Sequence, residues 1–454
     1  MSTGTTVDTT SDQELTIPNE GLSSSLNPIP EQRSVGSLER YVVASYEAPA
    51  QLDGDLTFEH GFLPRRLHTT ALTGAHAVWE DVAAGLPDLA FSPRAQAVLS
   101  DLPLLPAGPE DLPDHQVKWA STLLGMIAHS YWRFGLERLH LPRNSNISAE
   151  LPDSIKVPWT QVCQRMGRTG PCLTLEDWVF NNFTFIDKSH PSPDGDYRVE
   201  DAVIESIRPV VPAYGNETER VFTSSFVDIH AASASAVKQV CQAQRAIELG
   251  GPDGHADVAA ALLRIAECAR GATRAFRKVS PRHNSKTFCD PVAWAKTLVT
   301  WTVPPPGYPA GPSGSASPLV HLMDAVIGRT EYDSDQGRFG KMLRGSQLPR
   351  RLEQFFDLIC AADFRGYVLS LRDAGGTRFD ETQEAFNELV DAFAGPHGFL
   401  GVHKGKVVDY LGVGTVVGRN QSTAHDQTYI ADSSWTAMAD RLHISIGERD
   451  VRRV

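Results

Sequence analysis

The chain has 454 residues, of which 41% are hydrophobic and 21% charged, a composition typical of a globular protein with a substantial core. Its formal net charge of -13 argues against a broad phosphate-binding surface, so we expect no nucleic-acid partner. The six cysteines form no C-x-x-C pair and no apolar run reaches membrane-spanning length, which predicts reduced thiols and a cytoplasmic protein without a membrane partner.

Changes in composition divide the chain into four parts. Residues 1–35 are rich in Ser, Thr, Pro and Asn and offer little to bury, which predicts a disordered tail. Residues 191–215 are rich in Pro and Gly and predict a linker. We therefore expect a small N-terminal helical domain over residues 36–190 and a large helical domain over residues 216–454. Because neither strand alternation nor βαβ spacing is present, the predicted fold class is all-α.

Three segments carry a clear helical period. Apolar side chains recur at three- and four-residue intervals in residues 118–134, 258–276 and 384–393. Such a pattern predicts a helix that buries one face. In the last segment the predicted buried face consists of Ala385, Phe386, Leu389, Val390 and Phe393.

Two histidines, His397 and His403, follow the last of these helices. A histidine in an apolar helical setting is either a hydrogen-bonded core residue or an axial ligand of heme iron, because neutral imidazole is a good iron donor. Spacing alone favours the core residue.

The surrounding sequence resembles a known family. Residues 364–375, FRGYVLSLRDAG, resemble the segment VREFVLSKGDAG of the indoleamine 2,3-dioxygenase family. In that family the proximal histidine follows in the pattern His-x3-Val-x2-Tyr-Ile, and residues 403–411, HKGKVVDYL, are similar to it. His397 remains the alternative, because it lies closer to the family's distance from the preceding helix. The resemblance implies heme b held by one of these histidines and O2 as co-substrate.

The resemblance runs in the same order from about residue 119 to residue 415 and implies a substrate pocket. One register of the alignment places Phe222 and Phe226 in that pocket, and the other register places Ser224 there. The loop at residues 302–316 resembles the family's GGSAGQSS loop over the distal heme face, so the resemblance implies catalytic roles for Ser315 and Ala316. The implied pocket residues are Leu175, Trp178, Val179, Phe222, Phe226, Phe288, Lys296 and Leu298.

Two departures from the family pattern concern charged groups. The position of the family's substrate-carboxylate Arg is Ala295 here, and neighbouring Lys296 is a point charge that does not replace a bidentate Arg. The family's Arg before the proximal histidine, which meets a heme propionate, is Leu400. Arg350, Arg351, Arg372 and Arg419 are the candidates to replace it. Because Ala295 cannot bind a substrate carboxylate, free L-tryptophan is not the expected substrate.

The resemblance implies a heme-dependent dioxygenase that cleaves the C2–C3 bond of an indole or related aromatic. We expect the chain to be a monomer. A non-catalytic heme sensor and a heme monooxygenase acting on another aromatic are the alternatives. A carboxylate-bridged di-iron bundle needs two Glu-x-x-His motifs, and only Glu137 to His140 provides one. A zinc hydrolase of the H-E-x-x-H type is disfavoured because the motif is missing.

Overall fold

The computed structural model describes residues 36–47, 55–68, 71–134, 150–305, 308, 310–374, 377–416 and 435–454. The predicted tail, residues 1–35, lies outside them. Within the described residues the chain is mostly helical, which confirms the predicted helical class. The one sheet found there pairs β1 (Phe183–Phe185) antiparallel with β2 (Ile207–Pro209), which the sequence analysis did not predict. In the described part of the chain, no helix combines the length and the apolar character needed to cross a membrane.

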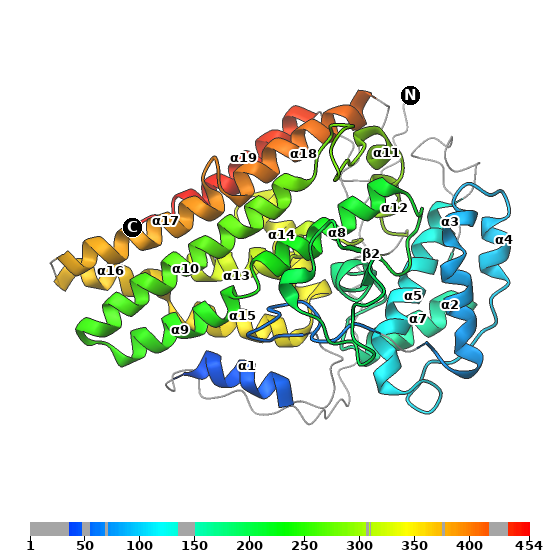
Figure 1. The fold of residues 1–454 in the computed structure, drawn as a ribbon, viewed down its shortest axis with the longest axis horizontal. Helices are drawn as coiled ribbons and strands as arrows, with labels where there is room; N and C mark the ends of the chain where they lie inside the picture. The colour runs from blue at the N-terminus through cyan, green and yellow to red at the C-terminus, as the bar shows by residue number, and fades with distance from the viewer. Residues whose placement is uncertain are drawn as a thin grey trace, which may run out of the picture.

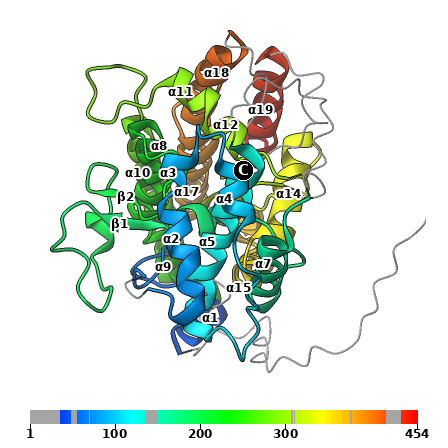
Figure 2. The same cartoon turned by 90° about the vertical axis from the view of Figure 1, so that its right-hand side faces the viewer.

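The first group of helices lies at one end of the molecule (Figures 1 and 2). Its helices are α2 (Ala77–Ala84), α3 (Leu86–Leu89), α4 (Ala95–Ser100), α5 (Asp114–Arg133) and α7 (Asp153–Arg165). The predicted helix at residues 118–134 is α5, which is buried along most of its length because α2, α4 and α7 pack around it. A short π-helical turn, η3 (Glu176–Phe180), closes the group against α5 and the next helix, α8 (Glu217–Ala232).

The long helices of the second group lie side by side along the rest of the molecule (Figure 1). Its helices are α9 (Ala236–Leu249), α10 (Gly251–Lys278), α11 (Pro291–Lys296), α12 (Leu298–Trp301), α13 (Pro318–Val326), α14 (Asp335–Gln347), α15 (Arg350–Ala362), α16 (Phe364–Ala374), α17 (Thr377–Ala394), α18 (Phe399–Val416) and α19 (Trp435–Asp450). The central helix is α10, which contains the predicted seam at residues 258–276 and contacts α8, α9, α17 and α18.

The predicted apolar face of α17 is confirmed. Ala385, Phe386, Leu389, Val390 and Phe393 are all at most 2% exposed, because this face packs against α10. Burying each large side chain of this kind contributes about 1.5 to 3 kcal/mol. The pairing of α10 with α17 therefore forms a main part of the hydrophobic core of the second group of helices, here called the second core.

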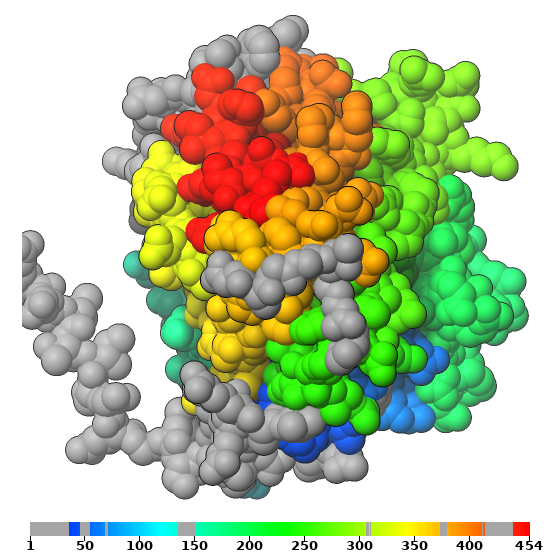
Figure 3. Space-filling model, turned by 90° about the vertical axis from the view of Figure 1, so that its left-hand side faces the viewer, coloured from blue at the N-terminus to red at the C-terminus, as the bar shows by residue number. Residues whose placement is uncertain are grey.

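Packing crosses the predicted boundary between the two parts of the chain. The first helix, α1 (Ser37–Glu47), packs against α9 and α15, and its Leu38 and Val42 belong to the second core. Conversely, Trp294 and Tyr410 belong to the hydrophobic core around the first group of helices, here called the first core. The last helix, α19, lies on the surface between α14 on one side and α17 and α18 on the other (Figure 3). This position makes α19 one wall of the space that α18 and α13 enclose.

Candidate functional site

A cavity of about 210 Å³ lies at the centre of the second group of helices, between α8, α10, α13, α18 and α19. The loop that enters α13 also lines it. By the same measure a single water needs about 10 to 15 Å³, so the cavity is large enough for a multi-ring ligand. Most of its wall is apolar, and the polar atoms gather along the loop and α19.

The first turns of α18 bring His403 and Val407 to this cavity, because residues four apart share one face of a helix. Tyr410, one turn further, anchors the same helix. Its hydroxyl donates a 2.8 Å hydrogen bond to the Cys289 carbonyl, and its ring lies edge-on against Trp294 with centroids 5.4 Å apart. The His-x3-Val-x2-Tyr spacing therefore joins two cavity residues to a docking residue on one helix.

His403 is a neutral imidazole held by packing. Burial lowers its pKa from 6.5 to about 4, because the charged form would lose its hydration. Its ring stacks on Phe276 with centroids 5.6 Å apart, and no hydrogen bond to the ring is found among the described residues. His397 is exposed in the turn before α18, and its carbonyl accepts a hydrogen bond from Arg277. Of the two candidates, the structure places only His403 at the cavity.

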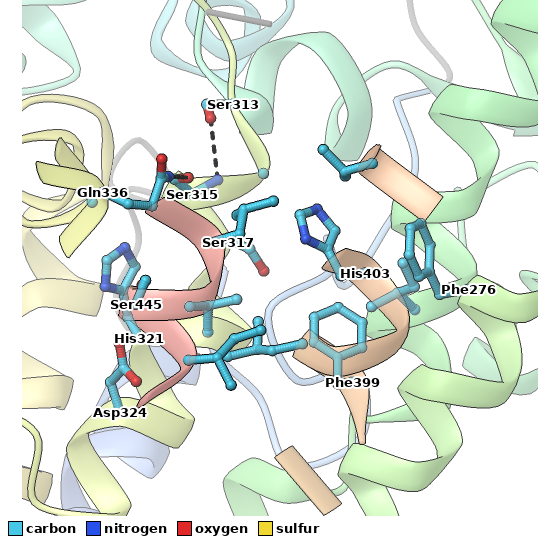
Figure 4. Close-up of a pocket in the computed structure, with 18 of the residues that line it drawn as sticks. Phe276, Ser313, Ser315, Ser317, His321, Asp324, Gln336, Phe399, His403 and Ser445 are labelled. Carbon is cyan, nitrogen blue, oxygen red and sulfur yellow. Dashed lines mark hydrogen bonds between the residues drawn. The ribbon is translucent and has the colours of Figure 1, made fainter. Parts of the chain in front are cut away.

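The loop before α13 forms the polar side of the cavity (Figure 4). Its 3-10 turn, η5 (Gly314–Ala316), is capped by Ser313, whose hydroxyl oxygen accepts from the Ser315 amide at 3.2 Å. Gln336 of α14 donates to the Ser315 hydroxyl oxygen at 2.8 Å. A Cβ on Gly314 would lie 3.3 Å from the Phe226 ring, so glycine lets the loop approach α8 closely.

The wall that α8 contributes fits one of the two registers considered. Phe222 and Phe226 line the cavity with their ring centroids 5.4 Å apart, and Ser225 and His230 lie on the same side. Ser224 does not line it, and its hydroxyl donates to the Ile207 carbonyl at 3.2 Å. The register that presents the two phenylalanines is the one that the structure adopts.

Other predicted pocket and catalytic residues lie outside the cavity lining. Trp178 packs behind Phe222 with centroids 5.9 Å apart, so it supports the wall without forming it. Phe288 packs on His283, because the segment before α11 runs along the surface. Lys296 is exposed. The residues placed outside the lining are Leu175, Trp178, Val179, Phe288, Lys296, Leu298 and Ala316, of which Leu175 and Ala316 line a separate cavity of about 20 Å³.

On α11 the cavity residue is Trp294, which the sequence analysis did not select. Ala295 is 1% exposed within the first core, so the position matched to the family's Arg does not line the cavity. The sequence signal was a tryptophan beside the expected position, but a short helix that begins with Pro291 gives too few turns to fix which side chain points inward. His230, His321 and Gln336 were missed for a different reason, because no motif marks them.

Charged side chains of the lining form a buried cluster. Asp324 of α13 is 2% exposed and accepts hydrogen bonds from Arg329 at 2.7 Å and from two nitrogens of Arg449 at 2.7 and 2.8 Å. Arg329 also pairs with Glu448. Leu400, at the position of the family's propionate Arg, lines the cavity without a charge. Of the predicted replacements, Arg350, Arg351 and Arg372 do not line it, and Arg419 lies outside the described residues.

The sequence profile of the indoleamine 2,3-dioxygenase family matches residues 53–294. The chain belongs to this family. The match covers more than half of the 454 residues, from the first helices through α8 and α10 to Trp294. No individual curated protein matches the chain.

Membership of the indoleamine 2,3-dioxygenase family makes the chain a heme-dependent dioxygenase, an oxidoreductase. Members of the family bind heme and use dioxygen on indole-type substrates. Among the described residues no cluster of three or more His, Cys, Asp or Glu side chains is arranged to hold a metal ion. The Glu-x-x-His motif of Glu137 to His140 lies outside the described residues. The matched region ends before the loop at residues 313–317 and before His403.

Proposed function

We propose that this chain holds heme b in the central cavity through His403 and oxygenates an indole-type aromatic with dioxygen. The observation that carries the proposal is a neutral imidazole at the wall of a large cavity, with no hydrogen bond to its ring among the described residues. A lone pair that no other group engages is what an axial ligand to iron requires. His403 therefore fits the role of proximal ligand.

The remaining lining fits a macrocycle with an apolar face and an anionic edge. Phe276 and Phe399 flank His403, and Val407 lies one turn away, so a flat apolar surface is available for the macrocycle beside His403. Arg329 and Arg449 supply positive charge to the lining, and the buried Nε of Arg329 has no hydrogen-bond partner among the described residues. An anionic propionate would compensate this orphaned donor.

When bound, heme iron would supply the centre that binds and activates dioxygen, and the electrons that reduce the dioxygen come from the aromatic substrate. The chain's own residues bind and orient the substrate. Phe222, Phe226 and Trp294 form an aromatic wall for a planar ring, and they exclude water from it. Ser315 and its neighbours present polar groups along one edge. Insertion of both oxygen atoms at the indole C2–C3 bond is the reaction that this site suits.

The substrate that we propose carries no free carboxylate. Ala295 is buried in the core and Lys296 is exposed, so neither places a cation in the cavity. Three arginines line it: Arg329 and Arg449 are paired with Asp324 and Glu448, and Arg441 lies on α19. The remaining donor of Arg329, its Nε, is the one assigned above to a heme propionate. Because the position of the family's Arg offers no cation, and Arg329 and Arg449 are already paired, we favour a neutral indole.

Heme binding can be tested with a matched pair of variants. His403→Ala should abolish the Soret band of purified, heme-reconstituted protein, because it removes the proposed iron ligand. His397→Ala should bind heme like the wild type, since that residue lies on the surface. If His397→Ala loses the Soret band and His403→Ala keeps it, the assignment is wrong. Wild-type protein that takes up no heme would contradict the proposed function as a whole.

A further inference from the structure

Two serines of the loop, Ser315 and Ser317, present different hydrogen-bonding groups to the cavity: one can donate to a ligand and the other can accept from it. Both side chains line it, and they lie two positions apart on and just after the η5 turn (Figure 4). Serine hydroxyls donate one hydrogen bond and accept two, so the partner already in place decides what remains for a ligand.

The histidine beside Ser317 has a single possible tautomer. His230 is 2% exposed, and its Nδ1 lies 2.7 Å from the Phe226 carbonyl, which can only accept, so Nδ1 carries the proton. Burial lowers the pKa of His230 to about 4, so the ring is neutral and Nε2 is a bare acceptor. Ser317 Oγ lies 3.0 Å from Nε2 and must therefore donate to it. The Ser317 oxygen keeps its lone pairs and faces the cavity as an acceptor.

The partner of Ser315 has the opposite effect. The side-chain amide of Gln336 donates to Ser315 Oγ at 2.8 Å. No hydrogen bond donated by the Ser315 hydroxyl is found among the described residues, so its proton is available to a ligand. The Ser313 cap on the Ser315 amide holds the backbone of the turn, while Gln336 and His230 orient the two hydroxyls before a ligand binds.

We propose that Ser315 and Ser317 form a donor–acceptor pair that selects an aromatic substrate bearing a neutral carboxamide. The amide N–H donates to Ser317 Oγ and the amide carbonyl accepts from the Ser315 hydroxyl. A carboxylate lacks the N–H and would direct an anionic oxygen at the Ser317 acceptor. This inference rests on the proposed function, because it names the substrate class of the same cavity.

Binding of three probes to heme-loaded protein tests the inference. The probes are indole-3-acetamide, indole-3-acetate and 3-methylindole, with dissociation constants measured by titration calorimetry. We expect the amide to bind at least about tenfold more tightly than the acetate, since the acetate lacks the N–H donor and places an anionic oxygen against the Ser317 acceptor. Equal or tighter binding of the acetate would overturn the inference.

Variants assign the preference to these residues. Ser317→Ala should weaken amide binding about two- to tenfold and leave 3-methylindole unchanged. His230→Leu should instead shrink the ratio between amide and acetate, because Ser317 is then free to turn its proton toward a carboxylate. Ser233→Ala is the matched control, since it deletes a buried hydroxyl that bonds its own helix outside the cavity lining. An unchanged ratio in both cavity variants would refute the pairing.

The same preparations distinguish a failure of the donor–acceptor pair from a failure of the proposed function. Protein that binds heme and oxidises 3-methylindole but shows no amide preference contradicts only the donor–acceptor pair. Protein that binds no heme contradicts the proposed function and this inference together. Heme content and circular dichroism of each variant show that a change in the ratio does not come from misfolding.

Discussion

Asp324→Asn should strongly destabilise the folded protein. The carboxylate is 2% exposed and accepts three charge-assisted hydrogen bonds, one of 2.7 Å from Arg329 and two of 2.7 and 2.8 Å from Arg449, which join α13 to α19. Asn keeps the shape but is neutral, and it leaves the guanidinium groups of Arg329 and Arg449 buried with one negative partner, Glu448. Removing one member of such a buried cluster costs about 3 to 5 kcal/mol.

Urea unfolding followed by far-ultraviolet circular dichroism measures this loss. Because two of these hydrogen bonds hold α19 in place, Asp324→Asn should also make α19 more sensitive to limited proteolysis. Asp335→Asn is the matched control, since Asp335 pairs with Arg338 where both side chains are more than half exposed, at 55% and 59%. Such surface pairs contribute about 0 to 1 kcal/mol. A loss below about 1 kcal/mol for Asp324→Asn would show that the cluster does not anchor α19.

Two further predictions concern pH and substrate. Burial lowers the pKa of His129, His230 and His321 from 6.5 to about 4, so between these values the unfolded chain binds protons that the folded chain excludes. Stability should be complete above pH 6.5 and fall as the pH approaches 4, by roughly 2 kcal/mol per histidine at pH 5, and equal urea midpoints at pH 7 and pH 5 would contradict this. Free L-tryptophan should be turned over with a kcat/KM roughly ten- to a hundredfold below that of a neutral indole. Efficient production of N-formylkynurenine would disprove the altered substrate and leave the heme assignment standing.

Local patterns in the sequence were sufficient for three of the helices and for one end of the site. The apolar period of residues 384–393 predicted the buried face of α17, because a helix places residues three and four apart on one side. The spacing of His403, Val407 and Tyr410 likewise holds within one helix, and the structure places the first two at the cavity. The pattern of residues 364–415 also carried the family resemblance, which the match over residues 53–294 confirms independently.

The walls of the cavity were decided by tertiary structure. Trp294, rather than Lys296, faces the cavity because α11 is a short helix whose orientation depends on its docking against α18. His230 meets Ser317, and Asp324 meets Arg449, only after elements far apart in the chain have packed together. Periodicity records which face of a helix is apolar, but it carries no information about the partner of that face. The sequence by itself therefore determined three of the helices, the family and two candidate iron ligands, whereas the packing of α8, α13 and α19 determined which polar groups share one cavity with His403.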